Sequence, residues 1–331
     1  MTQTSAKSLS SQSSPSAAAQ MGLASKVGPW GSALIEAAAT RQDIVALSAD
    51  LKKYTDLKGF AEAFPDRYIE VGMAEQSLVL SAAGLAYSGL TAVATSFAAF
   101  LGRRTLDFAT MQIALPKANV ILVGATPGIS ATFGPSHTST DDLAIWRTVP
   151  NMTVIDPMDP LEAAQAMTYL LNRGGPAYLR QPFNRASAVR TLELPAFEFG
   201  KAQILRTGSD VAIIASGDRV SEALLAAETL DAEGVSASVV RSSTIKPFDG
   251  DTIAEIAANC PHIVTAENHS VIGGLFSTVS ESLVRRGVAA KVTPIGVPDV
   301  HPPFGSPDYT SAVLGMTSAD IAKAALDLLS T

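Results

Sequence analysis

Short apolar runs alternate with helical segments along nearly the whole chain, and this alternation limits the possible folds more than any other feature. Runs such as IVALSAD (44–50), NVILVG (119–124) and DVAIIASG (210–217) are typical of buried strands, and segments with helical spacing of apolar residues separate them. Strands that alternate with helices form a mostly parallel sheet that is covered on both faces. The predicted fold class is therefore α/β, with doubly wound and mostly parallel sheets.

The alternation loosens once, and this divides the chain into two units. A chain of 331 residues is also long for a single core and suits two domains of ordinary size. We predict an α/β domain at residues 25–185, a linker at residues 186–200 and a second, smaller α/β domain at residues 201–331. Residues 1–24 are rich in Ser, Ala and Gln, which predicts a disordered tail.

Composition argues against several classes of partner. The net charge is −7, so the chain offers no basic stripe for a nucleic-acid backbone. No apolar run reaches the roughly 18 to 20 residues of a membrane span, and the first twenty residues lack the apolar segment of a signal peptide. We expect a soluble, cytoplasmic protein. The single cysteine, Cys260, and four scattered histidines make no metal-ligand cluster, so we expect this chain to hold no metal itself.

The stretch from Tyr68 to Arg104 contains a candidate acid–base residue, Glu75. The residues that follow it have helical spacing, so Glu75 lies at or just inside a helix N-terminus, where a negative charge is stabilised. A second interpretation is a carboxylate in a dry pocket for acid–base chemistry. Phe97 and Phe100 stand three residues apart and share a face, either as a platform for a flat ring or as core residues. The segment alone does not decide between these interpretations.

Four other residues could carry chemistry, each with an ordinary structural alternative. Asp50 ends a strand and could point to the sheet edge or cap a turn. His137, in the long GPSHTSTDD loop, suits proton transfer, but it could also be a surface or capping histidine. Arg180, at a strand end in YLRQP, suits a phosphate or carboxylate clamp or a salt bridge. His269 precedes two glycines, which could bind an anion or only turn the chain.

Several motifs that would identify an enzyme class are missing from the sequence. It contains no GxGxxG after a strand, no GxxxxGK[ST], no GxSxG and no HExxH. The dinucleotide-binding, P-loop, α/β-hydrolase and zincin classes therefore lack support. Composition and spacing alone indicate a two-domain α/β protein with a suggestive loop.

A series of short segments, taken in order, resembles the C-terminal half of transketolase, and above all the short second chain of split transketolases. The segments are SADL, YIEVGMAEQ, TSFAAFLGRR, GPSHTSTDDLAIWRTVPNMTVIDPMD, YLRQ and ENHSVIGGL. The resemblance extends over nearly everything after residue 25. It implies that the first unit is a pyrimidine-binding domain and the second a transketolase C-terminal domain. It also implies a thiamine diphosphate-dependent enzyme that transfers a two-carbon ketol unit between sugar phosphates.

The resemblance assigns cofactor roles to residues of the first unit. Glu75 matches the glutamate that hydrogen-bonds N1′ of the aminopyrimidine of thiamine diphosphate and favours the imino form of the ring. Phe97 and Phe100 match the aromatic residues that pack against the pyrimidine, and Asp50 matches an aspartate near the cofactor. Arg103 stands where full-length transketolases usually have a tyrosine, as it does in deoxyxylulose-phosphate synthases and many split chains.

The resemblance also assigns substrate roles, and two departures put the donor in question. His137 matches a histidine at the substrate hydroxyls, and Arg180 matches an arginine that binds the sugar phosphate. Thr126 and Phe133 replace the usual histidine and aspartate of the long loop. The missing aspartate normally helps to recognise a donor hydroxyl, so an unusual sugar phosphate or a 2-oxo acid donor becomes more plausible.

The largest departure is the absence of GDG with a downstream Asn, the motif that holds Mg²⁺ and the diphosphate in thiamine enzymes. The resemblance therefore implies a separate N-terminal transketolase subunit that carries GDG and the Mg²⁺ ligands, with an active site at the interface of an α2β2 assembly. Two alternatives stay open. One is the β-type subunit of a 2-oxo acid dehydrogenase E1 or a relative of deoxyxylulose-phosphate synthase; the other is a non-catalytic regulatory paralogue.

Overall fold

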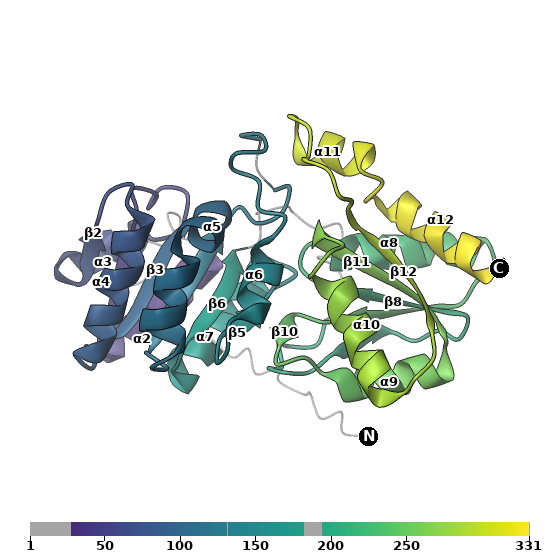
Figure 1. The fold of residues 1–331 in the computed structure, drawn as a ribbon, viewed down its shortest axis with the longest axis horizontal. Helices are drawn as coiled ribbons and strands as arrows, with labels where there is room; N and C mark the ends of the chain where they lie inside the picture. The colour runs from purple at the N-terminus through teal and green to yellow at the C-terminus, as the bar shows by residue number, and fades with distance from the viewer. Residues whose placement is uncertain (1–27, 131, 182–193, 331) are drawn as a thin grey trace, which may run out of the picture.

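The computed structural model describes residues 28–130, 132–181 and 194–330, which form two α/β units joined along a seam (Figure 1). Each unit is a sheet with helices on both faces, so the predicted fold class is confirmed. The predicted tail, residues 1–24, and residues 186–193 of the predicted linker lie outside the described residues. Within the described part of the chain, no helix is long and apolar enough to cross a membrane.

The first unit is built on a seven-stranded sheet with the order β10-β5-β6-β4-β3-β1-β2. Its pairs are parallel except that of β10 with β5. The central strands are buried along their whole length, which explains their continuous apolar sequences. The strands are β1 (Ile44–Ser48), β2 (Tyr68–Glu70), β3 (Thr91–Phe97), β4 (Val120–Ala125), β5 (Thr153–Ile155), β6 (Ala177–Gln181) and β10 (Thr244–Lys246).

Two separate apolar layers cover this sheet. One contains Leu34, Phe60 and Met167 from the helices of one face, and the other contains Leu78 and Leu101 from the opposite face. The helices of the first layer are α2 (Pro29–Thr40), α3 (Lys58–Ala63) and α7 (Pro160–Arg173), with the short turn η1 (Pro65–Arg67) nearby. The second layer has α4 (Glu75–Tyr87), α5 (Ala98–Ala109), the π-helical turn η2 (Thr110–Ala114) and α6 (Asp142–Thr148).

The second unit has a five-stranded sheet with the order β12-β11-β8-β9-β7, in which only the β7–β9 pair is antiparallel. Its strands are β7 (Gln203–Arg206), β8 (Val211–Ala215), β9 (Ala237–Arg241), β11 (His262–Ser270) and β12 (Lys291–Val297). Helices α8 (Arg219–Ala232) and α12 (Ser318–Leu329) cover one face, α9 (Gly250–Asn259) and α10 (Leu275–Arg286) the other, and α11 (Pro307–Val313) lies outside the sheet.

Strand β10 ties the two units together. It follows β9 of the second unit in the chain, yet it pairs with β5 at the edge of the first sheet. Ile245 of β10 belongs to one apolar cluster that includes Val154 of β5 and Ile253, Leu275 and Leu283 of the second unit. The buried Cys260 lies in the same cluster and packs there as an apolar residue. The two units therefore share a continuous core instead of meeting only through loops.

Candidate active site

The candidate acid–base residue, Glu75, lies where the fold gathers polar groups. Parallel strands end together at one edge of a sheet, and the loops that follow them are the usual place for a site in such folds. Strand β2 leads into α4, whose first residue is Glu75, and β3 runs through Ser96 and Phe97 directly into α5. The helix start that the sequence predicts for Glu75 is confirmed, and the neighbouring strand end places a hydroxyl and an aromatic ring beside it.

The carboxylate of Glu75 is buried but has charged and polar partners. Glu75 is 3% exposed, and its Oε2 accepts a 2.8 Å hydrogen bond from Nη1 of Arg104. The hydroxyl of Ser96 donates to Oε1 over 3.3 Å. The Arg104 guanidinium also lies 3.9 Å from the ring centroid of Phe100 and remains 47% exposed. The carboxylate is thus held in one orientation by a cation that itself faces outward.

Aromatic rings line one side of the site, and His137 belongs to them. The rings of Phe97 and Phe100 lie 5.8 Å apart between centroids, and His137 contacts both, at 5.9 and 5.1 Å. Phe133 lies against Phe97 at 6.0 Å, with an interplanar angle of 29°. The structure therefore brings together three predicted site residues, Phe97, Phe100 and His137. We call Phe97, Phe100, Phe133 and His137 the aromatic shelf.

The long loop that carries His137 is held at several points. Gly128 and Ser139 exchange two backbone hydrogen bonds of 2.8 and 3.1 Å, which close the loop at its base. Arg103 pairs with Asp141 at 2.9 Å and donates to the carbonyl of Thr138 at 3.2 Å. Arg103, predicted near the cofactor, thus anchors the loop, while its neighbour Arg104 reaches Glu75.

Asp50 lies just beyond the carboxyl end of β1, as its position in the sequence predicts. Its backbone has a left-handed conformation with φ of 59°, and the residue is exposed. The Asp50 amide donates a 2.6 Å hydrogen bond to Oε1 of Glu70, and the Gly72 amide donates to the same oxygen at 3.2 Å. Glu70 therefore fixes the turn between β2 and α4, and its role becomes visible only in the structure.

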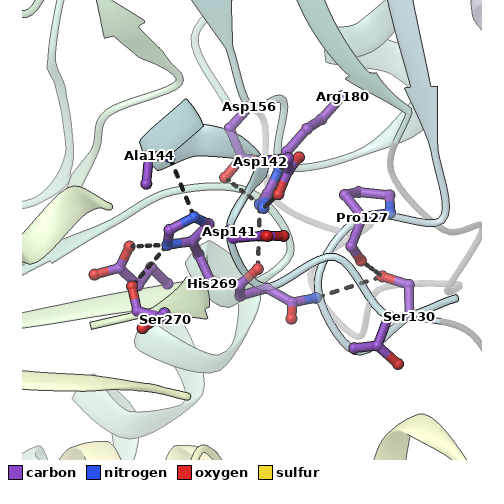
Figure 2. A network of polar contacts seen from close by, with 12 residues as sticks. Pro127, Ser130, Asp141, Asp142, Ala144, Asp156, Arg180, His269 and Ser270 are labelled. Atoms are coloured by element: carbon purple, nitrogen blue, oxygen red, sulfur yellow. Dashed lines mark hydrogen bonds and ion pairs between the residues drawn. The ribbon is translucent and has the colours of Figure 1, made fainter. Parts of the chain in front are cut away.

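Arg180 lies elsewhere, in a buried ionic network at the seam between the units (Figure 2). Its guanidinium is 1% exposed and makes a two-pronged contact with Asp142, at 2.6 and 2.8 Å. It also donates to Asp156 at 3.3 Å and to the carbonyl of Asn268 at 3.2 Å. The structure does not support the predicted phosphate clamp, because these internal partners occupy the guanidinium. It supports the alternative of a salt bridge, although a buried one.

The rest of this network extends into the second unit, and burial controls its protonation. Burial opposes ionisation of Asp142, but the charge and hydrogen bonds of Arg180, with smaller contributions from His269 and Tyr178, together lower the pKa of Asp142. Burial raises the pKa of Glu267 to about 8, although the amides of Leu275 and Phe276 donate to its carboxyl group. Burial, assisted by Arg180, lowers the pKa of His269 to about 4. His269 accepts from the Ala144 amide in the interior and is not an exposed anion site.

Comparison with known proteins identifies the family. Residues 30–186 match the model described as "Transketolase, pyrimidine binding domain", and residues 200–321 match "Transketolase, C-terminal domain". A putative uncharacterized transketolase family protein from Sinorhizobium fredii is 42% identical over 88% of this chain and 86% of its own length. The chain belongs to the transketolase family. The resemblance inferred from the sequence motifs is thereby confirmed.

Other relatives show that the chain corresponds to the C-terminal part of a transketolase. The 6-deoxy-6-sulfo-D-fructose transketolase subunit of Clostridium sp. is 41% identical over 88% of this chain and 90% of its own. A putative transketolase C-terminal section from Methanocaldococcus jannaschii is 38% identical over 89% and 93%. The 1-deoxy-D-xylulose-5-phosphate synthase of Carboxydothermus hydrogenoformans is 33% identical over 87% of this chain, which spans 46% of that enzyme.

Solved structures agree with this assignment. A structure titled "Split gene transketolase, inactive beta4 tetramer" has a TM-score of 0.81 and 36% identity, and the match covers 91% of this chain and 97% of the other. The transketolase of Leishmania mexicana shares the fold with a TM-score of 0.72 and 20% identity, over 90% of this chain and 44% of its own. This transketolase chain therefore has the extent of a split-gene subunit.

The site fits the aminopyrimidine part of thiamine diphosphate better than the rest of the cofactor. A flat ring requires an apolar wall and a fixed polar partner, and the aromatic shelf and the Glu75 carboxylate provide both. Thr126 directly follows strand β4, and Gln181 is the last residue of the neighbouring strand β6. Thr126 Oγ1 and Gln181 Oε1 are buried without a hydrogen-bond partner and could bind a polar ligand. Among the described residues, no group of three or more His, Cys, Asp or Glu side chains could hold a metal ion.

Sequence reasoning missed several residues of the site and the network. Arg104 carried a usable signal, because it stands four residues after Phe100 on a helix and such residues are neighbours. Ser96 had a weaker one, since it directly precedes Phe97, a predicted site residue at the end of β3. Asp142 and Asp156 carried no local signal, because their partner Arg180 is distant in the chain.

Proposed function

We propose that this chain is the pyrimidine-binding subunit of a heteromeric, thiamine diphosphate-dependent transketolase that transfers a two-carbon ketol unit between sugar phosphates. The observation that carries the proposal is the buried carboxylate of Glu75, oriented by Arg104 and Ser96 beside the aromatic shelf. A carboxylate in this setting can share a proton with a ring nitrogen while the ring packs against Phe97 and Phe100. The membership of the transketolase family supports the same assignment.

The residues of the site divide the work in the proposed reaction. Glu75 holds the proton at N1′ of the aminopyrimidine, and Phe97 and Phe100 orient the ring. Bound thiamine diphosphate supplies the carbanion chemistry, as cofactors do when the protein provides orientation and electrostatics. His137, a half-buried member of the shelf, donates or accepts a hydrogen bond at a substrate hydroxyl in this proposal. Arg180 has no part in substrate binding in this proposal, because its guanidinium is buried in ion pairs.

A partner subunit completes the site in this proposal. The described residues contain no metal-binding group, and the sequence has no GDG. We propose that an N-terminal transketolase subunit holds Mg²⁺ and the diphosphate, and that two copies of each chain assemble as α2β2 in the cytoplasm. The similarity to a putative transketolase C-terminal section supports a division of the enzyme between two chains.

The proposal is tested by purifying this chain with a partner that carries GDG and measuring ketol transfer. Glu75→Gln keeps the shape of the side chain but removes its charge, and we expect it to lower turnover by roughly 10²- to 10⁴-fold. Glu228→Gln, on the exposed face of α8, is the matched control and should leave turnover unchanged. Full turnover in an assembled Glu75→Gln complex would show that the carboxylate has no catalytic role.

Two observations suggest which donor substrates to assay. A relative at 41% identity is named for 6-deoxy-6-sulfo-D-fructose, so sulfonated ketoses belong in the panel beside ketose phosphates. Synthases of 1-deoxy-D-xylulose 5-phosphate are also relatives, at 33–35% identity, and this favours pyruvate as a second candidate donor. Release of CO₂ from pyruvate would support a synthase or E1-type reaction, and transfer without CO₂ supports a transketolase. A complex that binds thiamine diphosphate but turns over no donor would indicate a regulatory paralogue.

A further inference from the structure

A cavity of about 360 Å³ opens at the seam between the two units. Residues of helix α6, strand β10 and helix α10 line it. Figure 1 shows α6 in the first unit and α10 in the second. Its lining includes neither Glu75, nor a ring of the aromatic shelf, nor a member of the Arg180 network. The cavity is therefore a feature separate from the proposed active site.

The lining of this cavity is strongly positive, although the whole protein is acidic. Four of its side chains are cationic and one is a carboxylate, an excess of three positive charges in a chain whose net charge is −7. Charges of one sign around a concave surface with low-dielectric walls concentrate the electrostatic potential there. The charged lining residues are Arg147, Lys246, Arg285, Arg286 and Glu281.

Internal contacts position these cations but neutralise them only in part. Lys246 donates to the carbonyls of Arg147 and Val149 at the end of α6, and these carbonyls carry no formal charge. Arg147 and Arg285 share one carboxylate, Glu281, at 2.9 and 3.8 Å. Arg286 pairs at 2.8 Å with Asp251, which does not line the cavity, so the four cations face two carboxylates and an excess of two positive charges remains. Burial, together with the nearby Arg147 charge, lowers the pKa of Lys246, so its protonation has a cost here. An anion in the cavity would offset that cost.

We propose that this cavity binds a small phosphorylated anion. Arginine forks match the geometry of phosphate oxygens, and the Ser282 hydroxyl, which accepts from Arg286 Nη1, keeps its own proton for a ligand in the same lining. Phe248 adds an apolar wall for the carbon part of such a ligand, and the volume lies in the range of small-molecule sites. Because α6, β10 and α10 all contribute, the ligand would bridge the two units. Ligand binding should then stabilise the folded chain as a whole.

Calorimetric titration of the full chain with pyrophosphate, at an ionic strength of about 0.15 M, tests this proposal. We expect one saturable site. Arg285→Glu should raise the Kd for pyrophosphate about tenfold or more, because it exchanges an attractive charge for a repulsive one. Arg285 is chosen because it is 77% exposed and its contact with Glu281 is long, so the variant should fold. Equal melting temperatures without ligand would verify this.

Two matched variants locate the ligand. Lys291→Glu makes the same charge change at an exposed position that does not line the cavity, and it should leave the Kd unchanged. Pyrophosphate resembles part of the proposed cofactor, so Glu75→Gln tests whether it binds near Glu75 instead. If pyrophosphate occupies the cavity, this variant leaves the Kd unchanged; a changed Kd would place the ligand at the Glu75 site and overturn the proposal. Absence of saturation at millimolar pyrophosphate overturns the proposal, and so does an equal loss of affinity in Lys291→Glu. The assay measures binding without turnover, so its failure is distinguishable from failure of the proposed function.

Discussion

Two arginine–carboxylate pairs of similar length behave as opposites in this molecule. Arg104 contacts Glu75 at 2.8 Å, and Arg180 contacts Asp142 at 2.6 Å. Arg104 is 47% exposed and leaves the carboxylate beside an aromatic shelf, whereas both members of the Arg180 pair are fully buried. The same two functional groups therefore form part of an open site at Glu75 and a buried structural contact at the seam between the units.

The difference follows from solvent access. Water screens a pair of which one member is half exposed, as Arg104 is, so loss of the pair has little effect on folding and a ligand can replace the exposed partner. A buried pair has no access to water, and removing one member leaves an uncompensated charge in the interior. Replacing residues in each region should consequently affect different properties: activity at the Glu75 site, and stability at the seam.

The largest effect on stability should come from Arg180→Met. This change leaves Asp142 and Asp156 buried without their cation, and we expect it to lower the free energy of unfolding by about 3–5 kcal/mol. Urea denaturation of the purified chain measures the change. Arg173→Met, at the exposed end of α7, is the control and should change stability by less than about 0.5 kcal/mol. A loss below about 1 kcal/mol in Arg180→Met would mean that the two pairs are energetically alike.

The seam should also respond to pH through Glu267, and the direction follows from its pKa. Burial raises this pKa to about 8, above the ordinary value of 4.5, so the folded state holds a proton that the unfolded state releases. The resulting stability is complete below about pH 4.5 and is lost as the pH rises through 8. His269 acts in the opposite sense, because its lowered pKa costs stability as the pH falls from 6.5 toward 4.

Between pH 6.5 and 8 the contribution of Glu267 should therefore dominate that of His269. We expect a decrease of up to about 2 kcal/mol in the free energy of unfolding over this range. Glu267→Gln stays neutral at every pH and should flatten the profile. Thermal denaturation of both proteins at several pH values measures the effect. If the slopes of the wild-type protein and the variant coincide, the proton on Glu267 does not contribute to stability.

The contrast between the two pairs also marks how far the sequence could predict this structure. The alternation of strands and helices predicted the sheets correctly because it is a local pattern, and the runs IVALSAD, NVILVG and DVAIIASG correspond to β1, β4 and β8. Strand β10 was missed, because its partner β5 lies about ninety residues earlier and only the folded chain brings them together. The burial of Arg180 was missed for the same reason.

The residues of the candidate site also differ in whether a local sequence pattern could place them. Phe97 and Phe100 stand three residues apart where β3 runs into α5, so their proximity could be inferred from spacing. Glu75 begins the preceding helix α4, and only the resemblance to a family placed it beside them. His137 reaches the shelf through a long loop, and only its resemblance to a family motif placed it there. The burial of Arg180 could not be inferred, because an arginine at a strand end has the same local sequence pattern whether it faces solvent or two carboxylates from distant parts of the chain. Burial depends on tertiary packing, which a single sequence pattern does not encode.

A smaller effect on stability is expected for Glu75→Gln in the isolated chain. Loss of the Glu75 charge frees Arg104, which is already half exposed and can be solvated, so the free energy of unfolding should change by less than about 1 kcal/mol. The same variant should abolish most turnover in the assembled enzyme. Urea denaturation beside the turnover assay makes the comparison. A stability loss as large as that expected for Arg180→Met would make Glu75 a structural residue.

The smallest effect on folding should come from Arg103→Ala, which tests whether the open region includes the long loop. Arg103 and Asp141 are each about 40% exposed, so their pair should contribute less than about 1 kcal/mol. The same side chain nevertheless holds the loop that positions His137. Steady-state kinetics of the assembled enzyme should show a several-fold rise in KM with a smaller change in kcat, since a looser loop weakens substrate binding more than the chemical step. An unchanged KM would show that the loop keeps His137 in place without the Arg103 contact. The open site would then consist only of Glu75 and its immediate neighbours.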